Sequence, residues 1–242
     1  MKKNKNNPII KFEQITKTYI TGPVKYQALK GIDIKINKGE FVAIIGHSGS
    51  GKSTIMNLMG ALDSPTSGKY FLNGKNISHY NPDELAEIRN KQIGFIFQSY
   101  NLLPRTTVLK NVERPMLYAG YPEEKRKKRA MEVLKIVGLA DKASNLSNHI
   151  SGGQIQRVAI ARALTMNPSI ILADEPTGNL DTKTAHEVMK FLVQLNKKGS
   201  TVVVITHEDD IAAFAKRIIK ITDGLVESRD YKLKTASFIT HD

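Results

Sequence analysis

The sequence contains no cysteine among its 242 residues. Disulfide bonds, thiolate zinc sites, iron–sulfur clusters and cysteine nucleophiles are therefore excluded. Long apolar runs are also missing. The richest runs, Phe41–Ile45 and Ile170–Ala173, have the length of strands and fall far short of the roughly 18 to 20 residues that cross a bilayer. No apolar segment follows the basic start, so no secretory signal is expected, and a cytoplasmic location is favoured.

Acidic residues are in the minority. The sequence has 36 Lys and Arg against 23 Asp and Glu, a formal net charge of +13. A chain this basic could bind nucleic acid, anionic lipid headgroups or phosphorylated small molecules. Part of the excess lies in the run Lys125–Arg129. This run could be the solvated face of a helix or a contact with anionic lipid, and charge alone does not choose between them.

The hydrophobic pattern predicts an α/β core that is interrupted by a helical insert. The insert contains a long amphipathic helix over Glu123–Val137, which Gly138 closes. We expect a basic leader (1–8), a single domain (9–227) whose core covers about 9–98 and 165–227 with the insert at about 99–164, and a loosely held tail (228–242). The expected core elements are strands at Ile9–Tyr19, Leu29–Ile36, Phe41–Ile45, Ile170–Ala173, Val202–Ile205 and Arg217–Ile221, and helices at Ser53–Leu62, Thr184–Leu195 and Ile211–Phe214.

A glycine-rich loop directly follows the Phe41–Ile45 strand and precedes a helix. It matches the phosphate-binding pattern G-x-x-x-x-G-K-S/T, in which glycines let backbone N–H groups converge on phosphate oxygens and the helix start adds its positive dipole end. We expect Lys52 to bridge the β- and γ-phosphates of a nucleotide, and the Ser53 hydroxyl to bind Mg²⁺. The predicted nucleotide-binding residues here are Gly46, His47, Ser48, Gly49, Ser50, Gly51, Lys52, Ser53 and Thr54.

Two adjacent carboxylates end the Ile170–Ala173 strand. Asp174 could hold Mg²⁺ through water, and Glu175 could polarise a water molecule for attack on the γ-phosphate. Acidic residues commonly end strands in turns, so this pair is informative only together with the phosphate-binding loop.

Ser151, Gly152, Gly153 and Gln154 open another helix. The serine and glycines predict a second anion-binding surface, made of backbone N–H groups and a hydroxyl. One chain that binds one nucleotide needs only one such surface. Two copies arranged head to tail would use both, each closing over the γ-phosphate bound by the other copy. Taken alone, the stretch could equally be an ordinary helix cap.

Together these motifs resemble the nucleotide-binding subunit of ATP-binding cassette (ABC) transporters, over about Ile9 to Glu227. The resemblance implies a P-loop NTPase (RecA-like) α/β core with an N-terminal antiparallel β subdomain and an inserted α-helical signature subdomain. The family usually has leucine at the position of Ile150, which is also apolar and similar in volume. The motifs occur in the family's order: an aromatic residue (Tyr19), Walker A (Gly46–Ser53), the Q-loop (Gln98), the signature (Ser151–Gln154), Walker B (Ile170–Asp174 with Glu175), the D-loop (Asn179–Asp181) and a switch histidine (His207).

The resemblance also implies roles for single residues. Tyr19 would stack on adenine, and Gln98 would reach Mg²⁺ and the attacking water and would act as a hinge. His207 would bond the γ-phosphate and hold Glu175. The cofactors would be ATP and Mg²⁺. The implied sets are catalytic Glu175, His207 and Gln98, metal-binding Ser53, Gln98 and Asp174, the D-loop residues Asn179 and Asp181, and the signature residues Ser151, Gly152, Gly153 and Gln154 acting on the other copy's ATP.

Within the family, Gly60–Gly68, Phe97–Pro104 and Thr177–Asp181 are similar to the group of macrolide exporters, lipoprotein-release ATPases and bacitracin-type peptide-resistance transporters. That similarity implies a homodimer when ATP is bound, held on the inner face of the cell membrane by a separate permease with a large extracytoplasmic domain. A membrane-fusion accessory protein would be compatible with it, and nucleic acid is not expected as a partner. The alternatives are an ATPase of the same superfamily that acts on nucleic acid or the ribosome, as the +13 charge would allow, and a cell-division-type bridging ATPase.

Overall fold

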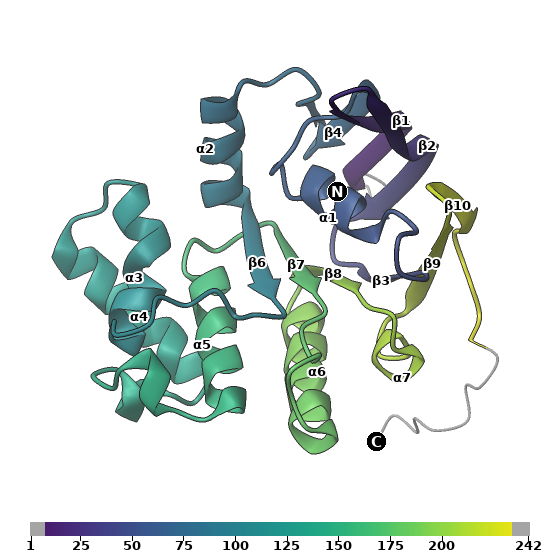
Figure 1. The fold of residues 1–242 in the computed structure, drawn as a ribbon. Helices are drawn as coiled ribbons and strands as arrows, with labels where there is room; N and C mark the ends of the chain where they lie inside the picture. Colours follow the sequence, from purple (N-terminus) through teal and green to yellow (C-terminus); the bar gives the residue numbers. More distant parts are fainter. Residues whose placement is uncertain (1–7, 234–242) are drawn as a thin grey trace, which may run out of the picture.

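The computed structural model describes residues 8–233, which form two β-sheets and a separate group of helices (Figure 1). An antiparallel sheet has the strand order β2-β1-β4-β5, and a six-stranded, mostly parallel sheet has the order β10-β9-β3-β8-β7-β6. The first sheet consists of β1 (Pro8–Thr21), β2 (Val24–Asn37), β4 (Ser67–Leu72) and β5 (Lys75–Asn76). The second consists of β3 (Phe41–Ile45), β6 (Ile93–Phe97), β7 (Ile170–Asp174), β8 (Thr201–Ile205), β9 (Arg217–Thr222) and β10 (Leu225–Ser228).

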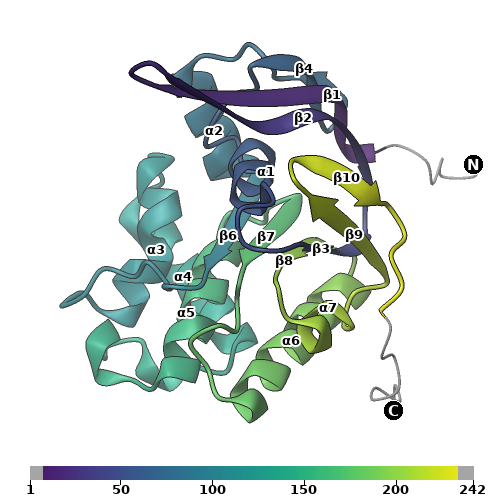
Figure 2. The same cartoon turned by 45° about the vertical axis from the view of Figure 1, so that its right-hand side comes forward.

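Strand β3 is buried on both faces of the six-stranded sheet, as its continuous apolar run predicts. Val42 and Ile44 join a core cluster that also contains residues of helix α1 (Lys52–Met59) and of the antiparallel sheet. Ala43 and Ile45 face the opposite side, toward α7 (Asp209–Ala212). Helix α1 therefore lies between the two sheets (Figure 2).

The carboxyl ends of β3, β6, β7 and β8 lie at one edge of the sheet, because these strands pair in parallel. The phosphate-binding loop, Gln98, Glu175 and His207 each follow one of these strands within two residues. Parallel pairing therefore brings four distant parts of the sequence to the same edge.

The helices between β6 and β7 form the group at the side of the molecule in Figure 1. They pack around buried Val112, Val133, Leu134 and Val158, which belong to one cluster with the face of the sheet that helix α6 (Thr182–Lys197) covers. The group comprises α3 (Val108–Tyr118), α4 (Glu123–Ile136), α5 (Gly152–Leu164) and the 3-10 turns Ala140–Lys142 and Ser147–His149; outside it lie α2 (Pro82–Gln92) and α6 (Thr182–Lys197). This architecture confirms the α/β fold class with an antiparallel β part and inserted helices.

The basic run Lys125–Arg129 is on α4, and its arginines bond to the rest of the protein. Arg126 Nε lies 3.5 Å from Glu113 Oε2 on α3. Arg129 donates to the carbonyl oxygens of Leu164 and Thr165. These contacts fix α4 against its neighbours through the two arginines, while Lys125, Lys127 and Lys128 of the same run are exposed.

The end of the described chain is more ordered than the expected loose tail. Strand β10 pairs antiparallel with β9. Beyond it, the Tyr231 N–H donates to the Ile218 carbonyl oxygen at 2.9 Å, and Tyr231 and Leu233 pack beside Ala43 and Ile45. The rest of the expected tail, 234–242, and residues 1–7 of the leader lie outside the described residues, while Pro8 already belongs to β1.

Helix boundaries differ modestly from the expected ones. Helix α1 begins at Lys52 and ends at Met59, three residues before the expected end, and α7 is shifted to Asp209–Ala212. No helix within residues 8–233 combines the length and the apolar character needed to cross a membrane.

Candidate functional site

A cavity of about 870 Å³ opens at the carboxyl edge of the six-stranded sheet. The phosphate-binding loop, the first turn of α1 and the segments after β6, β7 and β8 form most of its wall. Among the predicted site residues, those that line it are Gly46, His47, Ser48, Gly49, Gly51, Lys52, Ser53, Thr54, Gln98, Asp174, Glu175 and His207. Ser50 is buried below this surface, with 4% of its area exposed.

The phosphate-binding loop has the curled backbone that its glycines predict. Gly51 has φ 105°, and a Cβ atom at Gly46 would clash with the Ile221 carbonyl oxygen, so a larger residue fits at neither position. The Lys52 ammonium folds over the loop and donates to the carbonyl oxygens of Gly46 at 2.7 Å and His47 at 2.9 Å. Helix α1 starts at Lys52, so its free N–H groups and this cation face the same cavity, which suits a polyphosphate.

Glu175 is held in a strained conformation at the end of β7. Its φ is 44°, a conformation that costs an L-residue about 1–3 kcal/mol. Three hydrogen bonds hold it there. Its N–H donates to Ile205 O at 2.8 Å, Thr206 Oγ1 donates to Oε2 at 3.1 Å, and His207 Nδ1 lies 2.7 Å from Oε1. The carboxylate is thus oriented in the cavity wall, where it could accept a proton from a water molecule.

Two ionisable side chains at the carboxyl edge of the sheet, Asp174 and His207, have raised pKa values. Burial raises the pKa of Asp174, the Glu175 carboxylate raises it further, and the Lys52 ammonium acts in the opposite direction. The hydrogen bond to Glu175 and the charge of that carboxylate raise the pKa of His207. Glu208 makes a smaller contribution in the same direction.

We expect an NMR titration of the His207 ring to give a midpoint above the ordinary histidine value of about 6.5. At a pH below the ordinary histidine pKa, the His207 ring is charged even when it has no partner, and its ion pair with Glu175 is fully formed. As the pH rises through the raised pKa, the proton leaves and the stabilisation is lost. Glu175→Gln should return the midpoint toward the ordinary value. Glu208→Gln is the matched control and should move it less, and equal midpoints in wild type and Glu175→Gln would contradict the assignment.

The D-loop residues bond to the rest of the site from outside the cavity. The Asn179 side chain donates to the Gln98 carbonyl oxygen at 2.8 Å. Asp181 caps α6 by accepting from the Thr184 N–H and hydroxyl, and these bonds lower the pKa of Asp181. Asn179 and Asp181 are not among the described residues that line the cavity.

The signature residues also lie outside the cavity of their own chain. Ser151 caps α5 in a capping box, in which its hydroxyl accepts from the Gln154 N–H at 3.4 Å and its own N–H donates to Gln154 Oε1 at 3.0 Å. Within one chain, the stretch is therefore an ordinary helix cap. Because these residues do not line the cavity of their own chain, they could contact only a nucleotide that is bound elsewhere, as in a second copy of the chain.

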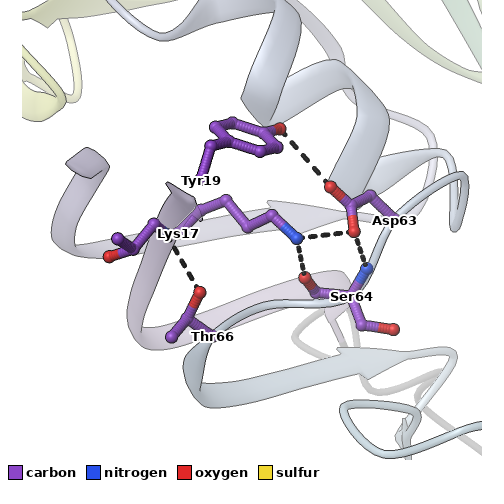
Figure 3. Close-up of polar contacts among 6 residues, drawn as sticks. Lys17, Tyr19, Asp63, Ser64 and Thr66 are labelled. Atoms are coloured by element: carbon purple, nitrogen blue, oxygen red, sulfur yellow. Dashed lines mark hydrogen bonds and ion pairs between the residues drawn. The ribbon is translucent and has the colours of Figure 1, made fainter. Parts of the chain in front are cut away.

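Tyr19, expected to stack on adenine, is not among the described residues that line the cavity. Its hydroxyl lies 3.4 Å from Asp63 Oδ2 (Figure 3), and Lys17 Nζ lies 5.2 Å from its ring centroid. Lys17 also bonds to Asp63 Oδ1 at 2.6 Å and to the Ser64 carbonyl oxygen at 2.8 Å. The structure therefore shows Tyr19 engaged with the loop after α1, and its role at the base remains a proposal.

Sequence reasoning missed several residues of the cavity wall: Tyr26, Ala28, Ile205, Asp209, Lys220 and Tyr231. Of these residues, only Tyr26 has a position that the sequence pattern could have predicted. The Gly22-Pro23 turn pairs Thr21 with Val24, so counting outward from the turn places Tyr26 opposite Tyr19. The position of Tyr231 could not have been predicted, because no periodic pattern links it to the sheet.

Comparison with known proteins decides the family. Residues 29–178 match the ABC transporter family. The chain belongs to the ABC transporter family. A dimeric bacterial ABC transporter cassette, MJ0796, superposes with a TM-score of 0.83 at 47% identity, covering 93% of this chain and all of that one. The same cassette in a dimeric post-hydrolysis state bound to ADP and Pi matches at 46% identity, also with a TM-score of 0.83. This chain is accordingly an ABC-type ATPase that binds and hydrolyses ATP.

The curated relatives are of two lengths. An uncharacterized ABC transporter ATP-binding protein of Thermotoga maritima is 50% identical over 90% of this chain and 94% of its own length. A macrolide export ATP-binding/permease protein, MacB, of Campylobacter fetus is 51% identical over 93% of this chain but only 36% of its own. The chain thus spans about a third of the MacB relatives, whose names include a permease.

Proposed function

We propose that two copies of this ABC ATPase close head to tail around two Mg·ATP and that this closure drives a separate membrane permease. The main support is the position of the signature. Ser151 stands at the start of α5, outside the cavity formed by its own Lys52 and Glu175. A second copy supplies a cavity for that helix start to cover. Two similar cassettes are dimeric, which agrees with this arrangement.

The donor groups of the cavity fit Mg²⁺. The Ser53 hydroxyl, the Gln98 amide and the Asp174 carboxylate all line it, and oxygen donors of this kind are those that Mg²⁺ prefers. Within residues 8–233 there is no cluster of three His, Cys, Asp or Glu side chains that could hold a metal. Mg²⁺ needs no such cluster, because it commonly takes one or two carboxylates together with phosphate oxygens and water. Bound there, it would neutralise charge on the phosphates.

The side chains divide the work at the γ-phosphate. Lys52 and the first N–H groups of α1 bind the phosphates, and the Lys52 ammonium exchanges its contacts with loop carbonyl oxygens for phosphate oxygens. Glu175 takes a proton from the attacking water at its carboxylate. His207 and Thr206 hold both oxygens of that carboxylate, which keeps it aimed despite the strained φ. The signature helix of the second copy completes the enclosure with backbone N–H groups.

The permease would dock in a groove of about 770 Å³ between the sheet and the inserted helices. Phe95 and Phe97 of β6 line it from the sheet side and Tyr118 from α3. Strand β6 leads directly from this groove to Gln98 in the nucleotide cavity. A permease segment in the groove could therefore sense the state of the site through β6. The presence of a permease in the longer MacB relatives favours this occupant.

Co-purification of a permease with the tagged chain from solubilised membranes tests this function. Tyr118→Ala should lower the amount of permease recovered several-fold, because it removes an exposed ring from the groove. Tyr121→Ala is the matched control, since Tyr121 is also an exposed tyrosine near α3 but does not line the groove, and it should retain the permease. Equal recovery with both variants would count against docking in the groove, and no recovery with wild type would count against the permease partner itself.

Within this family, export is the direction favoured by the macrolide export names of several relatives. We infer that the permease is a membrane protein with a large extracytoplasmic domain and that it holds the ATPase on the inner face of the membrane. The cargo belongs to the chemistry of macrolide-like or peptide antimicrobials, or of released lipoproteins. An accessory membrane-fusion protein would extend the same assembly.

A further inference from the structure

Gln156 is a fully buried polar residue of α5, the helix that the signature opens. Its side-chain amide donates to the carbonyl oxygen of Pro176, the residue directly after Glu175. Its Oε1 atom is buried as well and accepts no hydrogen bond from the described residues. A buried acceptor without a partner costs stability, which offsets much of what the bond to Pro176 contributes. The place where this bond is made therefore distinguishes Gln156 more than its contribution to stability does.

The bond is made to the turn that begins at the strained Glu175. The Gly178 N–H donates to the Glu175 carbonyl oxygen at 3.1 Å and closes this turn. On one side, the Glu175 N–H donates to Ile205 O, so β8 holds the start of the turn. On the other side, the Gln156 amide holds the next carbonyl group, that of Pro176. These two contacts flank the residue whose unfavourable φ of 44° has to be maintained.

Helix α5 can hold this turn because the helix is itself part of the core. It runs beside β6 and α6 (Figure 1). Its residues Val158 and Ile160 are fully buried in the cluster that includes the neighbouring sheet face. The turn also lies against the residue after β6, since a Cβ atom at Gly178 would clash with the Gln98 side chain. The turn is thus enclosed between α5, β8 and Gln98, and the Gln156 amide is its hydrogen bond to α5.

We propose that Gln156 is a positioning residue for Glu175. By fixing the Pro176 carbonyl group, its amide keeps the strained turn in the conformation that aims the Glu175 carboxylate into the nucleotide cavity of the same chain. Gln156 itself does not line that cavity, so it acts through the turn and not on the nucleotide. The inference rests on the proposed function, because it needs Glu175 as the base.

Steady-state ATP hydrolysis by Gln156→Met tests the role of the amide. Methionine has a similar length and volume but cannot donate to Pro176. We expect kcat to fall about tenfold, because the base is misplaced, and KM for ATP to stay unchanged, because the phosphate-binding loop is intact. Thr165→Val is the matched control. Thr165 is also buried, at the end of α5, and its hydroxyl bonds to the Val112 carbonyl oxygen at 3.0 Å, away from the cavity. It should lose similar thermal stability and keep its kcat.

A double variant shows whether the effect passes through the base. In a Glu175→Gln background, Gln156→Met should not lower the residual turnover further, because no base is left to position. A further tenfold loss there would mean that Gln156 acts on another part of the site, and the proposal would be wrong.

A mixed dimer shows which site the amide serves. One chain carries Ser151→Arg and keeps its cavity, and the other carries Lys52→Ala and keeps its signature, so only the site made of these two intact parts can turn over. Gln156→Met should lower this activity about tenfold in the chain with the intact cavity, whose Glu175 is used. In the chain with the intact signature it should leave the activity within about twofold.

The remaining outcomes also decide the matter. Unchanged kcat in Gln156→Met would overturn the proposal, and so would an equal loss of kcat in Thr165→Val, which would reduce the effect to stability. A loss that follows the chain with the intact signature would make Gln156 a support of the signature instead. A mixed dimer that is inactive even with Gln156 intact would count against the shared site of the proposed function, while kcat of the unmixed variant would still decide the role of Gln156.

Discussion

Replacing Glu175 by glutamine is expected to leave ATP binding intact and to lower ATP hydrolysis by at least about 100-fold. Glutamine has the same shape, and its amide can keep a contact with Thr206 or His207. It has no negative charge and cannot take a proton from the attacking water. Lys52 and the phosphate-binding loop, which bind the phosphates, are unchanged. Steady-state turnover and nucleotide binding measured on the same sample check both parts.

The same variant should accumulate a dimer when ATP is added, because closure occurs but the hydrolysis that reopens the dimer does not. Gel filtration with and without ATP measures this. Glu124→Gln, an exposed glutamate on α4, is the matched control and should hydrolyse ATP normally. Adding Lys52→Ala to Glu175→Gln should abolish the dimer, since it removes the cation paired to phosphate. Near-normal turnover in Glu175→Gln would exclude Glu175 as the base.

The residues of the cavity edge could be predicted because each directly follows an apolar strand. Phe41–Ile45 is buried on both faces, and its parallel neighbours end at the same edge. A motif that directly follows such a strand can therefore be placed at this edge of the sheet from the sequence alone. Gln98, Glu175 and His207 needed only this rule and the family resemblance to be assigned to one site.

The aromatic wall could not be predicted in the same way. The pairing of β1 with β2 shifts register at several points, between Phe12 and Ile15 and again between Lys17 and Thr18. Each shift turns the following side chains relative to a regular strand. Next to the Gly22-Pro23 turn the pairing is regular and sets Tyr19 opposite Tyr26. Which of the two borders the cavity depends on how the hairpin is anchored, as by the Lys17–Asp63 ion pair, and the alternation of residues does not predict that anchoring.

The segment after β10 shows a second limit of the sequence. Tyr231 and Leu233 occur in a stretch without helical or strand periodicity, yet one backbone bond to Ile218 and packing on β3 hold them at the sheet. A single backbone hydrogen bond of this kind does not require any particular residue type, so it leaves no recognisable pattern in the sequence. The signature shows the converse, because its helix cap was evident from Ser151 and Gln154, while its use by a second copy depends on assembly.

Ser151→Arg is expected to preserve ATP binding by the single chain and to lower hydrolysis at least about 100-fold. The arginine side chain would fill the space at the start of α5 and keep its N–H groups away from the γ-phosphate bound by the other copy. In the Glu175→Gln background, the same change should prevent the ATP-dependent dimer. Thr107→Arg is the matched control, because Thr107 caps α3 through the Lys110 N–H and its loss costs a similar cap of about 1 kcal/mol.

Mixing two inactive variants tests directly whether the site is shared between copies. In a dimer of one Ser151→Arg chain and one Lys52→Ala chain, both defects fall on one site. The other site combines the intact cavity of the first chain with the intact signature of the second. The mixture should therefore recover turnover that neither variant shows alone, measured as phosphate release against the mixing ratio. If each site were complete within one chain, the mixture would stay as inactive as its components, and head-to-tail sharing would have to be abandoned.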